Sequence, residues 1–216
     1  VAAARTAYER VWGPMPGRDR AKYLFRIARL IQERGRELAV LETLDNGKPI
    51  REARDTDIPL AAAHFFYYAG WADKLTHAGF GADPRPLGVA AQVIPWNFPL
   101  LMLAWKIAPA LAAGCTVVLK PAAETPLTAL AVARILAEAG VPDGVVNVVP
   151  TTDAATVVGT WLADRRVRKI SFTGSTNVGR ILLRQAADRV VNSSMELGGN
   201  APFVVTEDAD LDAAVE

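Results

Sequence analysis

The chain has 216 residues, of which 51% are hydrophobic, and 24 basic side chains stand against 23 acidic ones. A chain of this length and apolarity can bury a substantial core, and a net charge of +1 does not indicate a nucleic-acid surface. One cysteine excludes an intramolecular disulfide framework and favours a reducing compartment. There is no charged-then-apolar leader and no apolar run of the roughly 18 residues that a membrane span needs, so a cytoplasmic protein is expected.

The first part of the chain, up to about residue 78, has a helical pattern. Asp19 can cap a helix with one apolar face, and residues 45–49 break the pattern before a further helix. The aromatic cluster at residues 65–68 of that helix is expected in the core. Glycines and prolines in residues 79–86 indicate the boundary of a helical amino-terminal segment, residues 1–86, that packs on the domain after it.

From residue 87 onward, short β-branched or apolar runs alternate with helical patterns. Strands are expected at residues 89–94, 116–119, 145–149, 169–172 and 203–205, and helices at 100–111, 127–138, 154–162 and 178–187. This alternation predicts an α/β fold with a Rossmann-like parallel sheet over residues 87–216. Pro109 should kink or divide the first of these helices. The chain begins inside a helical pattern and stops at the start of another, so both ends are expected to be truncated.

Residues 94–99, Ile-Pro-Trp-Asn-Phe-Pro, hold one side-chain amide directly after a predicted strand. Pro95 and Pro99 restrict the backbone on both sides of Asn97. An amide held in this way can donate a hydrogen bond to a developing alkoxide, a role on the order of 3 kcal/mol. Alternatively, Asn97 only closes a turn, with its amide bonded to nearby backbone.

Two further segments follow predicted strands, where ligands bind in doubly wound sheets. Gly174 and Ser175 open the run Gly-Ser-Thr-Asn-Val-Gly, in which glycine lets the backbone approach a phosphate and the helix start favours an anion. The spacing differs from G-x-G-x-x-G, and a plain strand-to-helix turn explains it about as well. Lys120, before Pro121, can reach a ribose or a phosphate, or it is an ordinary solvated lysine.

Four segments occur in a fixed order: residues 94–99, Leu-Lys-Pro at 119–121, residues 172–180, and Met-Glu-Leu-Gly-Gly-Asn at 195–200. Together they resemble the NAD(P)-dependent aldehyde dehydrogenase superfamily, and the resemblance runs through nearly the whole chain. Residues 167–216 are most similar to succinate-semialdehyde dehydrogenases. The resemblance implies the amino-terminal and cofactor-binding portion of the aldehyde dehydrogenase fold, with a dinucleotide-binding domain at residues 87–216.

The resemblance also implies roles for single residues. Asn97 would hold the oxyanion and Glu196 would be the general base, whose proton affinity should be raised by Met195 and Leu197. Without the resemblance, Glu196 is a surface residue before a glycine turn, and Phe98, Met102 and Trp105 are an ordinary buried helix face. Matches to cofactor-binding positions are Ile94, Pro95, Trp96, Lys120, Ala123, Gly174, Ser175, Gly179, Leu197 and Gly198, and matches to the aldehyde tunnel are Phe98, Met102 and Trp105.

One position departs from the family pattern. Many NAD-preferring relatives carry an acid three positions after the lysine, where this chain has Ala123, and the acid comes one place later, at Glu124. Without a carboxylate beside the ribose 2′-oxygen a 2′-phosphate is not repelled, so NADP is the expected cofactor, with NAD not excluded.

Cys115, the only thiol, stands at the entry to a predicted strand and is expected to be buried and inert. The resemblance places the nucleophilic cysteine downstream of Glu216, and the sequence has no metal motif. One hypothesis is therefore an aldehyde dehydrogenase that acts on a small aldehyde, succinate semialdehyde being one candidate, and forms a homo-oligomer when complete. The other is a truncated, non-catalytic dinucleotide-binding or interaction module. Glu196 disfavours a third, an acylating enzyme that uses coenzyme A.

Overall fold

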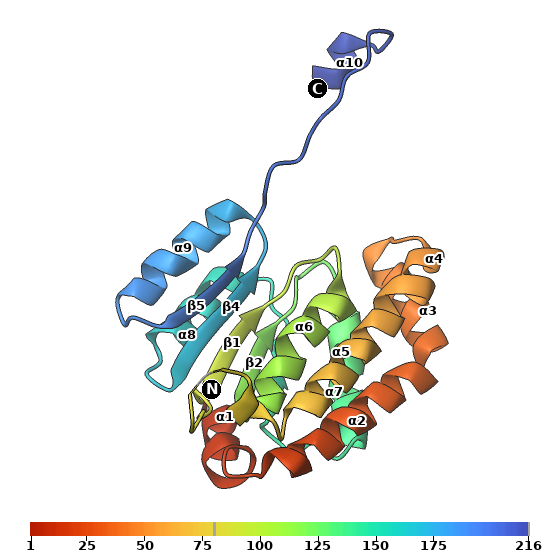
Figure 1. The fold of residues 1–216 in the computed structure, drawn as a ribbon. Helices are drawn as coiled ribbons and strands as arrows, with labels where there is room; N and C mark the ends of the chain where they lie inside the picture. The colour runs from red at the N-terminus through yellow and green to blue at the C-terminus, as the bar shows by residue number, and fades with distance from the viewer. Residues whose placement is uncertain (80, 216) are drawn as a thin grey trace.

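A parallel sheet of five strands forms the centre of the molecule in a computed structural model that describes residues 1–79 and 81–215 (Figure 1). The strands lie in the order β3-β2-β1-β4-β5 and every neighbouring pair is parallel. The first strand, β1, lies at the centre of the sheet. Strands β2 and β3 follow on one side of it, and β4 and β5 lie on the other side. Such a switch point is where doubly wound sheets bind ligands. The strands are β1 (Val89–Val93), β2 (Thr116–Lys120), β3 (Val146–Val148), β4 (Val167–Thr173) and β5 (Asn192–Glu196).

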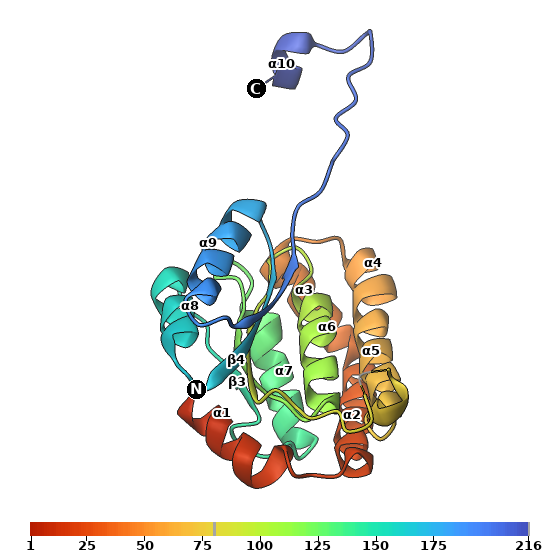
Figure 2. The ribbon, with the colours of Figure 1, turned by 60° about the vertical axis from the view of Figure 1, so that its left-hand side comes forward.

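Helices precede the sheet and cover both of its faces (Figures 1 and 2). Before the first strand lie α1 (Ala2–Ala7), η1 (Tyr8–Trp12), α2 (Gly17–Glu33), α3 (Gly35–Asn46), α4 (Ile50–Glu52), η2 (Ala53–Asp57), α5 (Ile58–Trp71) and η3 (Leu75–His77). Between and after the strands lie α6 (Pro99–Ala112), α7 (Leu127–Glu138), α8 (Ala154–Ala163), α9 (Thr176–Ala187) and α10 (Leu211–Val215). The expected α/β architecture with a helical start is confirmed. Phe80, inside the predicted boundary, and Glu216, the last residue of the predicted terminal helix start, lie outside the described residues.

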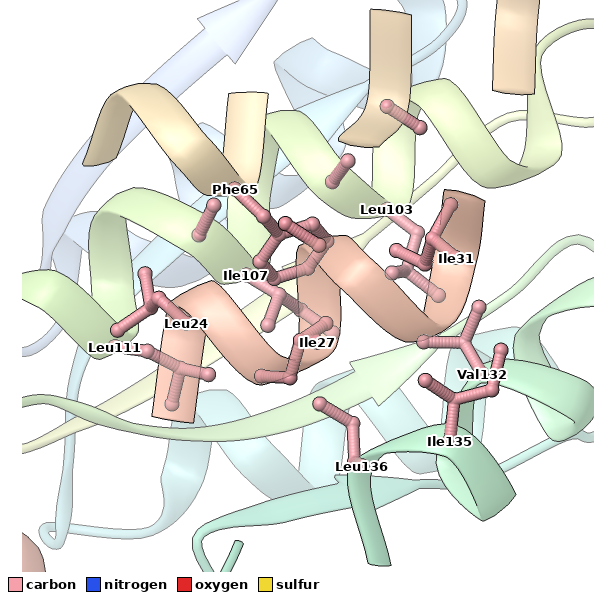
Figure 3. Close-up of a cluster of buried hydrophobic side chains, with 14 of the residues drawn as sticks. Leu24, Ile27, Ile31, Phe65, Leu103, Ile107, Leu111, Val132, Ile135 and Leu136 are labelled. Carbon is pink, nitrogen blue, oxygen red and sulfur yellow. The ribbon is translucent and has the colours of Figure 1, made fainter. Parts of the chain in front are cut away.

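Two apolar cores lie on opposite faces of the sheet. The larger contains α2, α5, α6 and α7, with Ile27, Phe65 and Ile107 fully buried at its centre (Figure 3). The smaller lies between the sheet and helices α8 and α9. Along β2, Val117 belongs to the larger core and Val118 to the smaller, because successive side chains of a strand point to opposite faces. A strand buried on both faces is typical of parallel sheets, and this explains why β2 is apolar throughout its centre.

Buried polar contacts join the amino-terminal helices to the sheet domain. The indole Nε1 of Trp12 donates to the carbonyl of Leu111 at 3.2 Å, and the hydroxyl of Thr116 donates to the carbonyl of Ala4 at 2.9 Å. Arg20, almost fully buried, donates to the carbonyl of Ala112 at 3.2 Å. These bonds lie beside the apolar contacts of the larger core, so residues 1–79 share a core with the sheet domain.

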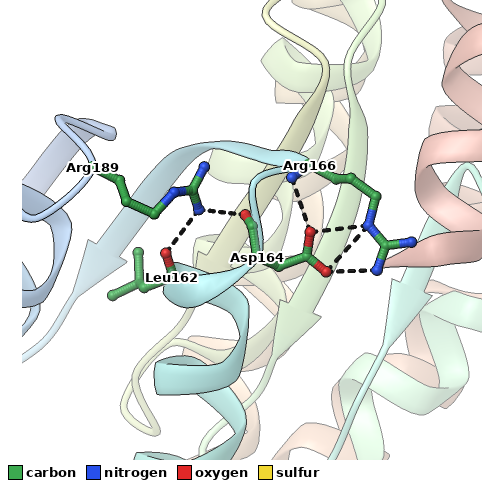
Figure 4. Close-up of polar contacts among 4 residues, drawn as sticks. All are labelled: Leu162, Asp164, Arg166 and Arg189. Atoms are coloured by element: carbon green, nitrogen blue, oxygen red, sulfur yellow. Dashed lines mark hydrogen bonds and ion pairs between the residues drawn. The ribbon is translucent and has the colours of Figure 1, made fainter.

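A polar cluster joins α8, the start of β4 and the end of α9 (Figure 4). Arg189 donates to the backbone carbonyls of Leu162 and Asp164. The carboxylate of Asp164 accepts from the side chain and the backbone amide of Arg166, and these bonds, led by the side-chain one, lower its pKa to about 2. Arg189, which follows α9, is thereby joined to the carboxyl end of α8.

The expectation that Asp19 caps helix α2 is wrong, and so is a division of helix α6 at Pro109. α2 begins at Gly17 behind Pro16, whose extended backbone sets the start, so Asp19 lies in the first turn and pairs with Lys22 at 2.8 Å instead of capping. Pro109 does not divide α6, which continues to Ala112. The proline lies in the last turn, where its missing amide removes a single helical hydrogen bond. The aromatic cluster is core only in part, since Phe65 is fully buried while Tyr67 is 59% exposed.

The strand pattern also needs two corrections. Residues 203–205, predicted as a strand, have no regular secondary structure, and Phe203 and Val204 are 77% and 82% exposed. A strand needs a partner for its amides and carbonyls, and this segment runs away from the sheet toward α10 (Figure 1). The fifth strand of the sheet is instead β5 at residues 192–196, which is largely polar and includes Glu196; it tolerates polar residues because it is an edge strand. No helix within residues 1–79 and 81–215 combines the length and apolarity needed to cross a bilayer.

Candidate active site

A cavity of about 470 Å³ opens where the carboxyl ends of β1, β4 and β5 meet. It lies at the switch point of the sheet, between the turn after β1 and the turn after β4. Thr173, which the sequence did not single out, also lines it, and its place directly before Gly174 at a strand end was the available signal. The cavity brings together ten of the predicted site residues: Pro95, Trp96, Asn97, Met102, Trp105, Gly174, Ser175, Glu196, Leu197 and Gly198.

The remaining predicted residues do not line this cavity. Ile94 is buried directly behind Pro95, and Phe98, 38% exposed, begins α6 as its N-cap residue. Lys120 ends β2 next to β1, and Ala123 is exposed in the turn that follows. Gly179 lies one turn into α9 and contacts Leu197. The predicted residues therefore divide into those that share one cavity and those outside its lining.

Asn97 is exposed, and its side chain has no hydrogen-bond partner in the part of the chain that the structure describes. The backbone carbonyls of the residues before and after it do accept hydrogen bonds. The carbonyl of Trp96 accepts from Nδ2 of Asn46, and the carbonyl of Phe98 accepts from the amide of Met102 at 2.9 Å. The alternative in which Asn97 closes a turn through its own amide is not observed. The amide remains available to donate into the cavity.

The turn between β4 and α9 contributes Gly174 and Ser175 to the cavity lining. Ser175 is the N-cap of α9, and its hydroxyl oxygen accepts from the amide of Val178 at 3.3 Å, which leaves the hydroxyl proton free to be donated. The amide of Gly174 donates to the carbonyl of Glu196 at 3.1 Å and so joins the ends of β4 and β5. The amides of the first turn of α9 lie at the positive end of the helix dipole. This arrangement suits an anion.

Two glycines allow close packing in this region. A Cβ on Gly174 would lie 2.6 Å from Cζ of Phe172, and a Cβ on Gly179 would lie 2.5 Å from a methyl carbon of Leu197. Both distances are below normal contact, so any larger residue would displace the ring or the leucine. Leu197 lines the cavity, and the absence of a side chain at Gly179 lets it rest on the helix.

Glu196 is exposed at the end of β5, so the apolar surroundings expected from Met195 and Leu197 are not found within the described residues. Lys106 on α6 is 8% exposed, and its Nζ donates to the hydroxyl of Ser171 at 2.9 Å. Burial lowers the pKa of Lys106 to about 8, and the charge of Glu196 opposes this effect. Sequence reasoning missed Lys106, although it is the only charged residue in the otherwise apolar helix α6.

Lys120 and Cys115 lie deeper in the domain. Lys120 is 8% exposed, so the solvated-lysine alternative is wrong; burial lowers its pKa, against the opposing charge of Glu124. Cys115 is a buried free thiol, and burial raises its pKa. The inert character expected for this cysteine agrees with both observations. It lies in a second cavity of about 360 Å³ that also includes Lys106.

A family profile, known protein sequences and solved structures were compared with the chain, and all three comparisons find the same family. A profile of the aldehyde dehydrogenase family matches residues 1–216. The chain is 48% identical to aldehyde dehydrogenase family 2 member B4, mitochondrial, from Arabidopsis thaliana, over 100% of this chain and 42% of that protein. It is 44% identical to a probable succinate-semialdehyde dehydrogenase from Sinorhizobium fredii, whose name includes NADP(+), over 100% of this chain and 47% of that protein.

A solved structure of an aldehyde dehydrogenase from Bacillus cereus in complex with NAD+ is 43% identical, with a TM-score of 0.84. That match covers 99% of this chain and 45% of the solved chain. The chain therefore spans less than half the length of the relatives that it matches.

Proposed function

Because the chain belongs to the aldehyde dehydrogenase family, we propose that it is the amino-terminal and cofactor-binding portion of an enzyme that oxidises an aldehyde to a carboxylic acid with NAD(P)+. The observation that supports this best is the cavity at the switch point, where Asn97, Ser175 and Glu196 meet from three separate segments. Such a meeting of polar groups at strand ends is the usual setting of a ligand site in a doubly wound sheet.

The donor set around the cavity fits an anionic dinucleotide. Ser175 and the free amides at the start of α9 are suited to the pyrophosphate, and Lys120 is suited to a ribose or a phosphate oxygen. The bound cofactor would supply a hydride acceptor. Ala123 is exposed and carries no charge, which supports use of NADP, alone or in addition to NAD. The relative named for NADP(+) and the related structure with NAD+ are compatible with either cofactor.

Asn97 and Glu196 would act on the aldehyde itself. A cysteine thiolate outside this chain would attack the aldehyde carbon, and the Asn97 amide would donate to the oxygen as it gains negative charge. After hydride loss, Glu196 would accept a proton from the water that hydrolyses the thioester. Met102 and Trp105, which line the cavity, would form part of the aldehyde channel, with Phe98 at its border. Succinate semialdehyde is one candidate substrate, supported by one of the relatives.

Location and assembly are further parts of the proposal. A cytoplasmic site of action is supported by Cys115 being a free thiol. A homo-oligomer is proposed for the complete protein. Fractionation of cells and the molar mass of the purified protein in solution would test these two points.

The central test is steady-state oxidation of a panel of aldehydes by the gene product that contains this chain. Activity of the wild type, with loss of turnover in Asn97→Ala and Glu196→Gln at unchanged cofactor affinity, is the expected result. Asn97→Ala should lower kcat by roughly 10²-fold or more. No aldehyde oxidation in the wild type would favour the second candidate, a non-catalytic dinucleotide-binding or interaction module. Its support is that Cys115, the only thiol of the 216 residues, is buried.

A further inference from the structure

The loop after α3 contacts both neighbours of Asn97. Asn46, the last residue of α3, donates from Nδ2 to the carbonyl of Trp96. Two residues later, Nζ of Lys48 lies 3.8 Å from the centroid of the Phe98 ring, which is cation–π geometry. Between them, Gly47 has a φ of 79°, so the chain reverses tightly enough to present both side chains to the same segment. The residues before and after Asn97 are thus both held by contacts with the same loop.

Lys48 is itself fixed. Its side chain is 11% exposed and forms ion pairs with Asp57 and, at 3.9 Å, with Glu42, whose side chains are 1% and 0% exposed. Glu42 belongs to α3, and Asp57 ends η2, a π-helical segment. Single-turn π segments occur frequently at functional sites. A lysine paired with the buried Asp57 carboxylate cannot move away from the Phe98 ring without leaving that charge unpaired.

The prolines on both sides of Asn97 limit the backbone torsions that can change the direction of its side chain. Pro95 and Pro99 have fixed φ angles and restrict the residues before them, so the torsions that still set the direction of the Asn97 amide belong mainly to Trp96, Asn97 and Phe98. The Asn97 side chain has no hydrogen bond of its own in the described part of the chain, and Phe98 is 38% exposed. Restraint must therefore come from contacts to the flanking residues.

We infer that Asn46 and Lys48 are positioning residues that hold Trp96 and Phe98, and through them direct the Asn97 amide into the cavity. The inference rests on the proposed function, because it gives these two residues a role only if Asn97 donates to a reacting oxygen. Neither Asn46 nor Lys48 lines the cavity. Their effect is on turnover and not on cofactor binding.

The test uses the gene product that contains this chain and counts folded sites by fluorescence titration with NAD(P)H. Asn46→Ala and Lys48→Met should each lower kcat per site by roughly tenfold or more, since small misplacements of a reacting group are costly. The dissociation constant of the cofactor should stay within about twofold of the wild type. Lys48→Arg, which keeps the charge over the ring, should restore most of the turnover. Lys74→Met, the same change at an exposed, ion-paired lysine, is the matched control.

A double-mutant cycle separates positioning from a general structural role. In an Asn97→Ala background, Asn46→Ala and Lys48→Met should cost little further kcat, because the amide that they direct is gone. Losses that simply add in that background would overturn the inference, and so would wild-type kcat per site in Asn46→Ala. If Lys48→Met does not fold, Asn46→Ala, which leaves the buried ion pairs intact, decides alone. Inactive wild type would refute the proposed function and the inference together, whereas an active wild type with a normal Asn46→Ala variant would refute only the inference.

Discussion

Replacing Glu42 with glutamine is expected to remove a pH dependence of stability that this one buried carboxyl creates. Glu42 is fully buried, and neither carboxylate oxygen has a hydrogen-bond partner in the described part of the chain. Burial, helped by the charge of Asp57 and opposed by that of Lys48, raises the pKa of Glu42 from 4.5 to about 7. The folded state therefore favours the protonated form, which an amide imitates at every pH.

The sign and the size follow from proton linkage. A group whose pKa is higher in the folded state contributes stability that is complete below its unfolded pKa and is lost as the pH rises through the folded pKa. For Glu42 the loss extends from pH 4.5 to about 7. At about 1.4 kcal/mol for each pH unit, it amounts to roughly 3 kcal/mol.

Urea unfolding at about pH 5 and about pH 8 measures the effect in the wild type and in Glu42→Gln. Between these two pH values, the free energy of unfolding of the variant should increase relative to that of the wild type by roughly 2.5 kcal/mol, because a small part of the effect is already present at pH 5. Comparing the two proteins cancels the titration of groups that do not interact with Glu42. Glu37→Gln, an exposed glutamate on the same helix, is the control and should behave like the wild type. Parallel pH profiles for wild type and Glu42→Gln would refute the reasoning.

Three further predictions concern the domain around the cavity. Burial lowers the pKa of Lys106 from 10.5 to about 8, so wild-type stability should rise between those pH values, and Lys106→Met should lose this rise in urea unfolding. In the complete gene product, kcat/KM should favour NADP or accept both cofactors, and Ala123→Glu should shift the ratio toward NAD; a hundredfold wild-type preference for NAD would contradict this. The 216-residue chain alone should form no NAD(P)H from aldehydes, and turnover that is lost in its Cys115→Ala variant would refute the assignment of that thiol as inert.

The regular elements of this fold follow closely from local sequence signals. Helix α7 occupies residues 127–138 as predicted, because its apolar period is uninterrupted and Gly140 ends it with a φ of 82°. Residues 203–205 are aromatic and β-branched, which predicts a strand, yet they form no strand. Propensity describes a residue's own preference, whereas a strand also needs a partner edge, and only the assembled molecule supplies that edge.

The site shows the same difference between what local sequence signals predict and what only the assembled molecule supplies. Motifs at strand ends predicted most of the cavity lining, because the topology of a parallel sheet brings the carboxyl ends of its strands together. Lys106 and the group of Glu42, Lys48 and Asp57 were not predicted. Each depends on burial by elements distant in sequence, and a lysine or a glutamate in a helical pattern carries no local sign of that burial.

The near-neutral chain also contains a local excess of buried positive charge. Lys106 and Lys120 are each 8% exposed, and for both of them burial is the main reason that the pKa is lowered. Taking an ammonium group out of water costs free energy, which Ser171 and the charges of Glu196 and Glu124 offset only in part. A net charge of +1 therefore says little about the local field, because that sum does not show where the two buried lysines lie.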